Sequence, residues 1–211
     1  MLLVGLTGNI GAGKSTVAGM LTARGAAIID SDVLARRAVR AGMPAHRAIV
    51  ERWGASVTTP DGEIDRAALR ERVFQDPDEL EALNHIVHPE ILRMRRSSIA
   101  DAEEGGARIV ICDIPLLFES NLAGDFDLLV LVDAPRPVRL ERLVRERGLR
   151  ETDAMNMIAA QMPAELKRAR ADIIVDNTGS LVGLEQRVRQ VWDTLVLEER
   201  RRASGAVHRV P

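Results

Sequence analysis

Short apolar runs without strict alternation recur along the chain, separated by segments with helical periodicity. Five of these runs predict strands, at residues 2–6, 26–29, 108–112, 128–132 and 173–175. Runs rich in valine, isoleucine and leucine that do not alternate are typical of strands buried on both faces of a parallel sheet. Because helical segments lie between the runs, the pattern predicts an α/β fold with a parallel sheet flanked by helices.

A glycine or an aspartate closely follows each predicted strand. These residues are Gly8, Asp30, Asp113, Asp133 and Asp176. The carboxyl ends of parallel strands meet at one edge of the sheet, where α/β proteins bind their ligands. The pattern therefore predicts a functional edge that carries carboxylates.

The long stretch between the second and third predicted strands contains helical signals and no convincing strand. Asp65 is a candidate N-cap, residues 76–79 are typical of a helix start, and Pro89 is expected to open a further helical stretch. A single crossover helix needs far fewer residues. Residues 42–105 are therefore predicted to form an inserted helical lobe.

The rest of the chain divides around this insertion. Residues 1–41 and 106–200 are predicted to form the core, and residues 201–211 a loose C-terminal tail. A second excursion, at residues 148–168 between the last two predicted strands, is expected to act as a lid.

Charge and composition exclude several classes of protein. The 29 Lys and Arg residues nearly balance the 31 Asp and Glu residues, so the chain lacks the basic field of a general nucleic-acid or membrane-surface binder. No apolar run approaches the ~20 residues that cross a bilayer. Cys112, the only cysteine, permits no intramolecular disulfide and is expected to be a buried small hydrophobe. These features predict a cytoplasmic protein without a membrane or nucleic-acid partner.

The cations are unevenly divided, because 27 are arginines and only two, Lys14 and Lys167, are lysines. A coding preference for arginine accounts for most of the imbalance, but it makes each lysine worth inspecting. Lys167 stands among arginines and is expected to be an ordinary lid or helix-end cation. Lys14 belongs to a motif.

Residues 8–15 read Gly-Asn-Ile-Gly-Ala-Gly-Lys-Ser, directly after a predicted strand and before a helical run. In this P-loop pattern, glycines let successive backbone amides face phosphate oxygens, and the following helix adds its positive end. Lys14 would reach the β- and γ-phosphates of a nucleoside triphosphate, and the Ser15 hydroxyl would ligate Mg²⁺.

A P-loop leaves the reaction open, and three classes compete. A regulatory GTPase needs an Asn-Lys-x-Asp segment, which neither lysine can supply. A motor or transport ATPase usually places a glutamate after its strand-end aspartate, whereas Asp113 is followed by Ile114 and Pro115. A small-molecule kinase remains, and it accounts for the inserted lobe as an acceptor site and for the arginine-rich lid.

Asp32 follows the second predicted strand and has two interpretations. A carboxylate at the ligand edge would accept or orient the proton of an attacking hydroxyl, as phosphoryl transfer requires. Alternatively, Asp32 is the N-cap of the next helix, a position that aspartate favours. The sequence alone leaves both interpretations open.

Five segments in this order resemble the dephospho-CoA kinase family. They are residues 5–16, 29–32, 83–89, 113–119 and 170–177, of which Leu-Asn-His-Ile-Val-His-Pro (83–89) and Asp-Ile-Pro-Leu-Leu-Phe-Glu (113–119) are the most distinctive. The resemblance implies transfer of the ATP γ-phosphoryl group to the ribose 3′-hydroxyl of dephospho-CoA, the last step of coenzyme A synthesis. It also implies a P-loop kinase core with five parallel strands, a helical CoA-binding lobe and a lid.

The resemblance further implies roles for single residues. On the ATP side they are Gly11, Ala12, Gly13, Lys14, Ser15, Thr16 and Asn177, the last in a loop near the adenine. On the acceptor side they are His88, Pro89, Asp113, Leu117 and Glu119, with Asp32 as the general base. Asp113 would also hold a metal-bound water. His85 and His88 lack a third ligand nearby, so a metal pair is not predicted.

The arginine that stabilises the transferring phosphate is left open by the sequence. Arg142 matches a lid-side position best, but Met157 stands where the family often has an arginine, so Arg147 and Arg150 also remain candidates. Arg142 belongs to a row with Arg136 and Arg139 at three-residue steps. Arginine grips phosphate well, yet a solvated face is the plainer interpretation for any one of them.

The predicted activity is that of an ATP- and Mg²⁺-dependent kinase acting on a small molecule. Another P-loop metabolite or nucleotide kinase is the nearest alternative. A regulator that binds ATP without phosphorylating anything is the alternative from a different class. The expected assembly is a monomer or a small homo-oligomer.

Overall fold

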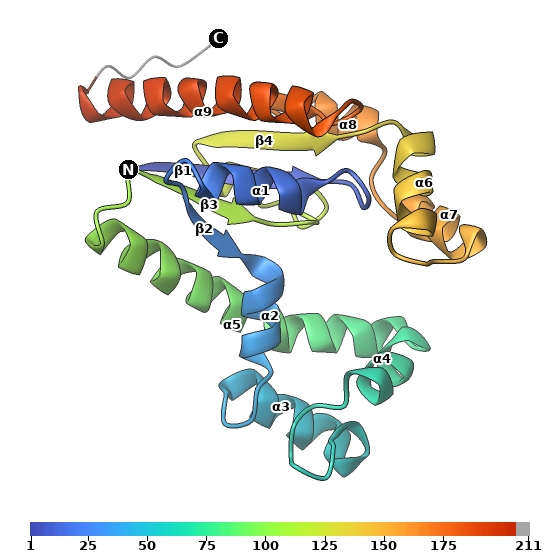
Figure 1. The fold of residues 1–211 in the computed structure, drawn as a ribbon. Coiled ribbons are helices and arrows are strands. Elements are labelled where there is room, and N and C mark those ends of the chain that lie inside the picture. Colours follow the sequence, from blue (N-terminus) through green and yellow to red (C-terminus); the bar gives the residue numbers. More distant parts are fainter. Residues whose placement is uncertain (206–211) are drawn as a thin grey trace. The chain divides into compact units, whose positions relative to one another are not determined.

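A computed structural model of the chain describes residues 1–205 and contains all five predicted strands (Figure 1). The strands are β1 (Leu2–Gly8), β2 (Ala27–Asp30), β3 (Ile109–Asp113), β4 (Leu128–Asp133) and β5 (Ile173–Asp176). Each ends on the polar residue or glycine that follows its apolar run. The prediction of an α/β fold with a five-stranded parallel sheet is confirmed.

Helices connect the strands and follow the last one. They are α1 (Lys14–Thr22), α2 (Ser31–Ala38), α3 (Pro44–Trp53), α4 (Arg66–Phe74), α5 (Pro77–Glu104), α6 (Arg136–Arg145), α7 (Glu151–Ala159), α8 (Ala164–Arg168) and α9 (Leu181–Ala203), with short 3₁₀ turns η1 (Gly54–Val57) and η2 (Ala123–Asp125). Among the described residues, no helix combines the length and the apolar character needed to cross a membrane.

The chain forms two compact units. One contains residues 1–29 and the chain from residue 102 on, and the other contains residues 30–101. The expected boundary of the insertion at residue 42 lies inside the second unit, because α2 contacts α3. We refer to the two units as the sheet unit and the helical unit.

Strand β1 lies at the centre of the sheet, whose order is β2-β3-β1-β4-β5. It pairs in parallel with both neighbours, so that Val4 lies beside Ile111 on β3 and Leu128 on β4. The loop after β1 therefore leaves the middle of the sheet, between the ends of β3 and β4. This is the edge at which α/β proteins bind ligands.

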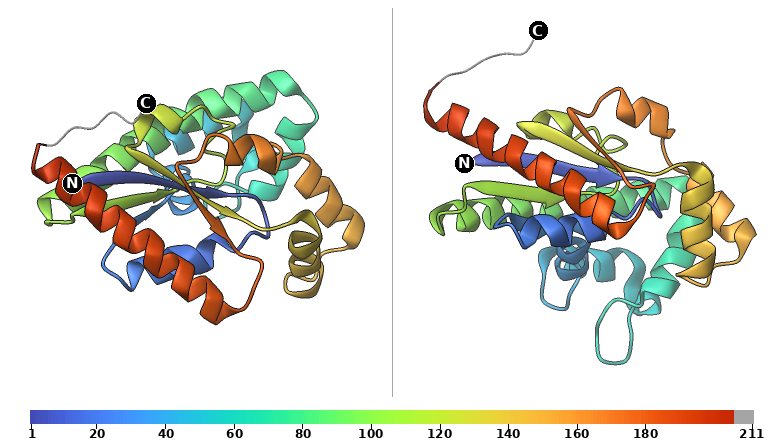
Figure 2. Two further views of the ribbon diagram at one scale, coloured as in Figure 1. Left: turned by 90° about the horizontal axis from the view of Figure 1, so that it is seen from above. Right: turned by 45° about the horizontal axis from the view of Figure 1, so that its top comes forward.

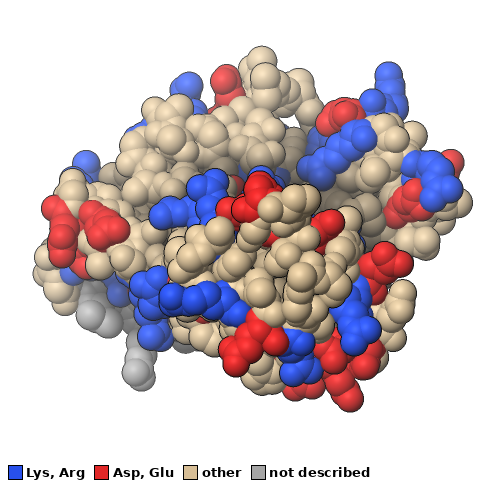
Figure 3. Space-filling view, turned by 90° about the horizontal axis from the view of Figure 1, so that it is seen from below, with Lys and Arg blue, Asp and Glu red and all other residues tan. Residues whose placement is uncertain are grey.

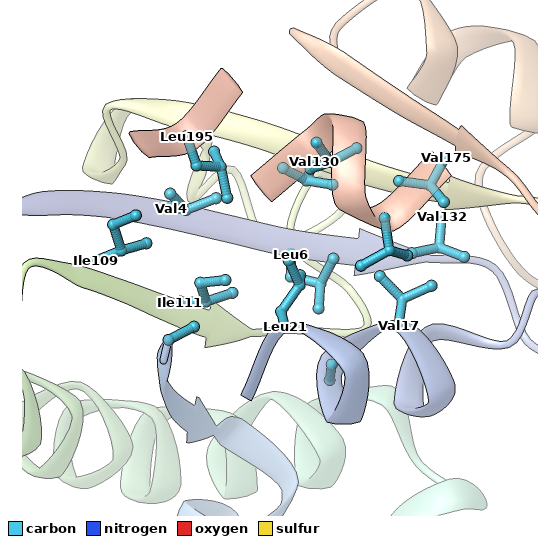
Figure 4. Packing of buried hydrophobic residues seen from close by; sticks show 14 of the residues in the cluster. Val4, Leu6, Val17, Leu21, Ile109, Ile111, Val130, Val132, Val175 and Leu195 are labelled. Atoms are coloured by element: carbon cyan, nitrogen blue, oxygen red, sulfur yellow. The ribbon is translucent and has the colours of Figure 1, made fainter. Parts of the chain in front are cut away.

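The core of the sheet unit forms between the strands and two helices, α1 and α9. Val4 and Leu6 of β1, Val17 of α1 and Leu195 of α9 are fully buried in one cluster (Figure 4). Helix α9 lies over the sheet and also contacts α1 (Figures 1 and 2). Burying each of these side chains contributes on the order of 1.5–3 kcal/mol. The packing fixes the start of α1, which follows the P-loop.

The helical unit has its own apolar cluster, formed by α3, α4 and partly buried residues of α5. Asp65 caps α4 as predicted, because its side chain accepts hydrogen bonds from the amides of Ala67 and Ala68. The expectation that Pro89 opens a new helix is wrong, since Pro89 lies inside the continuous helix α5. A proline there removes one backbone hydrogen bond, and a helix of 28 residues continues through it.

The loose tail predicted at residues 201–211 begins too early. Helix α9 continues to Ala203, and its last turn carries Arg200, Arg201 and Arg202. Cations at a helix C-terminus interact favourably with the helix dipole, which favours the extra turn. The part of the predicted tail at residues 206–211 lies outside the described residues.

Basic and acidic side chains are interspersed on the face shown in Figure 3, with no broad area of one sign. This mixture matches the net charge of -2. A surface of mixed sign gives little long-range attraction to a polyanion.

Candidate functional site

The P-loop is a tight turn between β1 and α1. Gly11 and Gly13 have φ angles of 77° and 89°, in the left-handed region that glycine adopts readily. Helix α1 starts at Lys14, and the side chains of Ser15 and Thr16 are exposed in its first turn. The free amides of a helix N-terminus favour an anion. The loop therefore has the geometry of a phosphate cradle.

Asn177 ties the loop after β5 to the P-loop. Its buried side-chain Nδ2 donates to the Ala12 carbonyl oxygen at 2.8 Å, and its backbone N–H donates to the Asp133 carbonyl oxygen at 2.7 Å. A Cβ on Gly13 would lie 2.2 Å from the same Nδ2. The sequence placed Asn177 on the nucleotide side. It did not reveal that the Asn177 side chain also binds the P-loop backbone.

Arg142 on α6 binds the backbone of the same two loops. Its Nη1 donates to the carbonyl oxygens of Gly11 and Ala12 at 3.3 and 3.4 Å, and its Nη2 donates to the Asn177 carbonyl oxygen at 2.8 Å. The guanidinium bonds only carbonyl oxygens of the P-loop, so it does not compete with an anion for the loop amides. Of the three candidate lid arginines, Arg147 is exposed and Arg150 pairs with Asp153 at 2.8 Å.

We expect Gly13→Ala to weaken ATP binding by more than roughly tenfold, since the new methyl group would displace Asn177 and force a strained φ angle. Gly19→Ala is the matched control, because a Cβ on Gly19 of α1 meets no atom within 4 Å. Calorimetric titration of both variants with ATP measures the effect. Equal affinities of the two variants would contradict the importance of this contact.

Lys14 forms an ion pair with Asp113, the last residue of β3. Both side chains are mostly buried. The Thr7 hydroxyl donates to the Pro115 carbonyl oxygen at 3.1 Å, which fixes the turn that follows Asp113 against β1. The structure thus brings together two residues that the sequence assigned to opposite sides of the reaction.

The segment after β3 contains both buried and exposed residues. Leu117 is fully buried. A Cβ on Gly5 of β1 would lie 2.6 Å from the Leu117 Cδ1, so β1 and the segment after β3 approach closely there. Phe118 is also buried, whereas Leu116 is 47% exposed. Leu117, expected to line the acceptor site, therefore lies in the core and supports the segment from below.

Lys167 corrects a prediction. It was expected to be an ordinary cation, yet its side chain on α8 is fully buried, and its Nζ lies 2.7 Å from Oε1 of Glu119. The same Glu119 oxygen accepts the Met162 amide at 3.2 Å. Burying an ammonium is costly unless a partner compensates it, and Glu119 is that partner.

Arg168 joins the acidic ends of β4 and β5. Its Nη1 lies 2.8 Å from Asp133 and 2.7 Å from Asp176. The hydrogen bonds that Arg168 donates to Asp176 and, second, to Asp133 raise the pKa of its guanidinium above the ordinary value. These two strand-end carboxylates, predicted to line the functional edge, therefore share one guanidinium within the protein.

Arg139 departs from the solvated face expected for the α6 arginines. It is 5% exposed, and its Nε donates to the Ala134 carbonyl oxygen at 3.0 Å, while Arg136 is exposed. Burial lowers the pKa of the Arg139 guanidinium, and the charge of Asp133 opposes this shift. Sequence periodicity placed these arginines on one stripe but gave no sign that Arg139 would be buried.

Asp30 resolves the question of the α2 cap within the helical unit. Its side chain accepts the amides of Asp32 and Val33 at 2.8 and 3.1 Å, so Asp30 is the N-cap. Asp32 lies in the first turn with an exposed side chain. The structural interpretation of Asp32 as the cap is wrong, and its carboxylate is left for another role.

The remaining acceptor-side candidates in the helical unit lie on α5. His88 and Pro89 are exposed, and His85 Nδ1 lies 3.0 Å from the Glu81 carbonyl oxygen. Within residues 1–205, no three His, Cys, Asp or Glu side chains gather as a metal site would require. The cysteine, Cys112 on β3, is buried in the sheet as expected.

Comparison with known proteins identifies the relatives of this chain. A family model described as dephospho-CoA kinase matches residues 2–183. A dephospho-CoA kinase of Thermobifida fusca is 47% identical over 195 residues, covering 92% of this chain and 96% of that protein. The Streptomyces avermitilis dephospho-CoA kinase is 49% identical over 197 residues, covering 93% and 95%.

Solved structures agree with these relatives. The crystal structure of TT1252 from Thermus thermophilus is 38% identical, with a TM-score of 0.81, and the match covers 92% of this chain and 97% of that one. A dephospho-CoA kinase from Campylobacter jejuni has a TM-score of 0.70 over 92% and 96% of the two chains. At 23% identity, the latter supports the fold.

Proposed function

The chain belongs to the dephospho-CoA kinase family, and we propose that it transfers the γ-phosphoryl group of ATP to the ribose 3′-hydroxyl of dephospho-CoA, giving coenzyme A and ADP. The observation that carries the proposal is the P-loop cradle with Lys14, in a chain that matches the family over residues 2–183. A kinase with a small-molecule acceptor also suits the face shown in Figure 3, which has no broad basic area. Such a reaction fits the cytoplasmic location expected from the sequence.

The P-loop residues 11–16 would hold the ATP phosphates through backbone amides and the N-terminus of α1. A hollow of about 580 Å³ beside the loop is lined by α6 residues, including Arg142 and Arg145, and by Thr178. Thr178 follows Asn177, so this hollow is our candidate for the adenosine part of ATP. Arg142 would then bind the loop backbone, and the part of its side chain that lines the hollow would face the nucleotide.

The residues at the start of α1 fit a magnesium ion bound together with ATP. Mg²⁺ is usually held by one or two protein oxygens plus phosphates and waters, not by an all-protein cage. Ser15 supplies an exposed hydroxyl in the first turn of α1, and Asp113 is a buried carboxylate at the end of β3. When bound, the ion would offset negative charge on the phosphates.

In the proposed reaction, the 3′-hydroxyl oxygen attacks the γ-phosphorus, and the bond from that phosphorus to the β,γ-bridging oxygen breaks. Asp32 would accept or orient the hydroxyl proton, and its exposed carboxylate is not needed as a helix cap. Lys14 would move from Asp113 toward the phosphates and stabilise the charge that builds up on the leaving ADP. Arg142 would keep the P-loop amides aligned.

The family motifs assign acceptor-side roles to residues in each unit separately. We propose His88 and Pro89 of α5 for the CoA side, together with Asp113 and Glu119 of the segment after β3. Leu117 would act by packing, since it is fully buried. These assignments follow the family motifs.

The test of the function is ADP formation by the purified chain with ATP, Mg²⁺ and a panel of acceptors. We expect turnover with dephospho-CoA to exceed turnover with nucleosides, nucleoside monophosphates and sugars by at least roughly a hundredfold in kcat/KM. A preference for another acceptor would identify a different metabolite kinase. ATP binding without acceptor-dependent ADP formation would favour a regulator and overturn the proposal.

A further inference from the structure

One short segment, residues 161–167, is bonded to two loops of the sheet unit that the proposed function places on opposite sides of the reaction. Oε1 of Gln161 accepts the backbone N–H of Ile10 in the P-loop at 2.8 Å. Six residues later, the Lys167 ammonium lies 2.7 Å from Glu119, which follows β3. We infer that residues 161–167 form a brace that positions the ATP-binding loop relative to the acceptor-side segment 113–119.

The acceptor-side end of the brace is built around a buried charge. Oε1 of Glu119 contacts both the Lys167 ammonium and the Met162 amide, so one carboxylate oxygen joins both ends of the brace. The Glu119 side chain is 23% exposed, whereas the Lys167 side chain is fully buried. A buried ion pair is weak support for stability, because a well-packed apolar pair is often equally stable. What the pair adds is a fixed direction for the Glu119 carboxylate.

The ATP-side end holds the P-loop at a second point. The Ile10 side chain packs against an apolar cluster of Leu143 on α6 with Ala154 and Ile158 on α7. Gln161 follows α7 and binds the Ile10 amide. The tip of the P-loop is thus fixed by its side chain and by its backbone to the elements that lead into the brace.

Chemistry gives a reason for such a brace. Transfer requires donor and acceptor atoms in near-contact geometry, and a misplacement of about 1 Å can cost roughly a hundredfold in rate. Gln161 and Lys167 are therefore assigned as positioning residues, which act through Ile10 and Glu119. This assignment rests on the proposed function, because it concerns the spacing between ATP and its acceptor.

Two single substitutions probe the two ends. For Lys167→Met, which removes the ammonium, we expect kcat/KM for dephospho-CoA to fall roughly 10- to 100-fold, with KM for ATP changed less than about threefold. For Gln161→Leu, we expect the ATP side to be affected more. KM for ATP should rise at least about threefold, and kcat/KM for dephospho-CoA should change less. Arg201→Met is the matched control, since it removes the cation of an exposed 2.7 Å pair with Glu198 on α9. A lowered melting temperature with unchanged kinetics in both variants would overturn the brace.

A second variant covers the case in which Lys167→Met fails to fold because Glu119 loses its partner. Lys167→Met/Glu119→Leu removes both charges and leaves no unpaired carboxylate. We expect this double variant to fold and still to show the low kcat/KM for dephospho-CoA. Wild-type kinetics in the folded double variant would overturn the inference.

Hydrogen exchange separates failure of the brace from failure of the proposed function. We expect Lys167→Met to lower the protection of the Met162 amide and Gln161→Leu to lower that of the Ile10 amide, in the absence of any substrate. If the wild type shows no dephospho-CoA-dependent turnover, the proposed function fails while this measurement still tests the brace. Unchanged protection of both amides would refute the brace itself.

Discussion

Replacing Asp32 by asparagine is expected to lower kcat by roughly 10²- to 10⁴-fold while leaving ATP affinity nearly unchanged. Asparagine keeps the size of the side chain and can accept a hydrogen bond, but it cannot take a proton from the attacking hydroxyl. Asp32 is exposed in the first turn of α2 and does not cap the helix. Loss of its charge should therefore leave the fold intact and affect only the chemical step. Steady-state kinetics together with calorimetric ATP binding measure the two effects.

The neighbouring Asp30 provides the control for this prediction. Asp30→Asn also removes one carboxylate, and asparagine is as good an N-cap as aspartate, so the bonds to the amides of Asp32 and Val33 are retained. We expect Asp30→Asn to have near-normal kcat and an unchanged melting temperature. Near-normal turnover of Asp32→Asn would show that Asp32 does not act on the proton, and the general base would have to be sought elsewhere.

Local patterns predicted the strands and the P-loop because both depend on short-range chemistry. A strand buried on both faces needs a continuous apolar run, and β1 shows this at the consecutive residues Val4, Gly5 and Leu6, all of which are buried. The P-loop requires glycine wherever the backbone is left-handed, as at Gly11 and Gly13. Such requirements concern residues that are adjacent in the sequence, so they can be recognised without knowledge of tertiary contacts.

Contacts between distant segments were not predictable from the same patterns. Lys167 looked like one more cation of an arginine-rich helix end, and its burial against Glu119 depends on how α8 packs beside β4. Arg168 likewise finds Asp133 and Asp176 only once β4 and β5 lie side by side. The signal that pointed to Lys167 was its rarity, since the chain uses arginine at 27 of its 29 cationic positions.

The two lysines share a structural setting that explains their retention. Lys14 pairs with Asp113 at the end of β3, and Lys167 pairs with Glu119 six residues further along the same segment. Both side chains are largely or fully buried. A compact ammonium on a flexible stem fits such a space, whereas a planar guanidinium needs more room and a fixed fork of acceptors. The rarity of lysine thus marks two buried sites.

The substitution Lys14→Arg keeps the positive charge at this position and changes only the shape of the cationic group. We expect kcat/KM for ATP to fall by roughly 10²- to 10³-fold, close to the loss in Lys14→Met, because the larger group would collide with the segment around Asp113 and would not reach the phosphates in the same way. A charge-only role predicts a different order, in which Lys14→Arg retains most of the activity and Lys14→Met loses it.

Arg142→Lys is the reciprocal control on the same loop. Arg142 uses both Nη atoms on three carbonyl oxygens, a task for which a single ammonium is poorly suited. We expect this variant to bind ATP less tightly, and we expect Arg24→Lys, which changes a partly exposed arginine bonded to the Met20 carbonyl oxygen on α1, to behave like the wild type. If Lys14→Arg and Arg142→Lys were both as active as the wild type, the shape of the cation would be irrelevant at this site, and arginine usage elsewhere would carry no information about function.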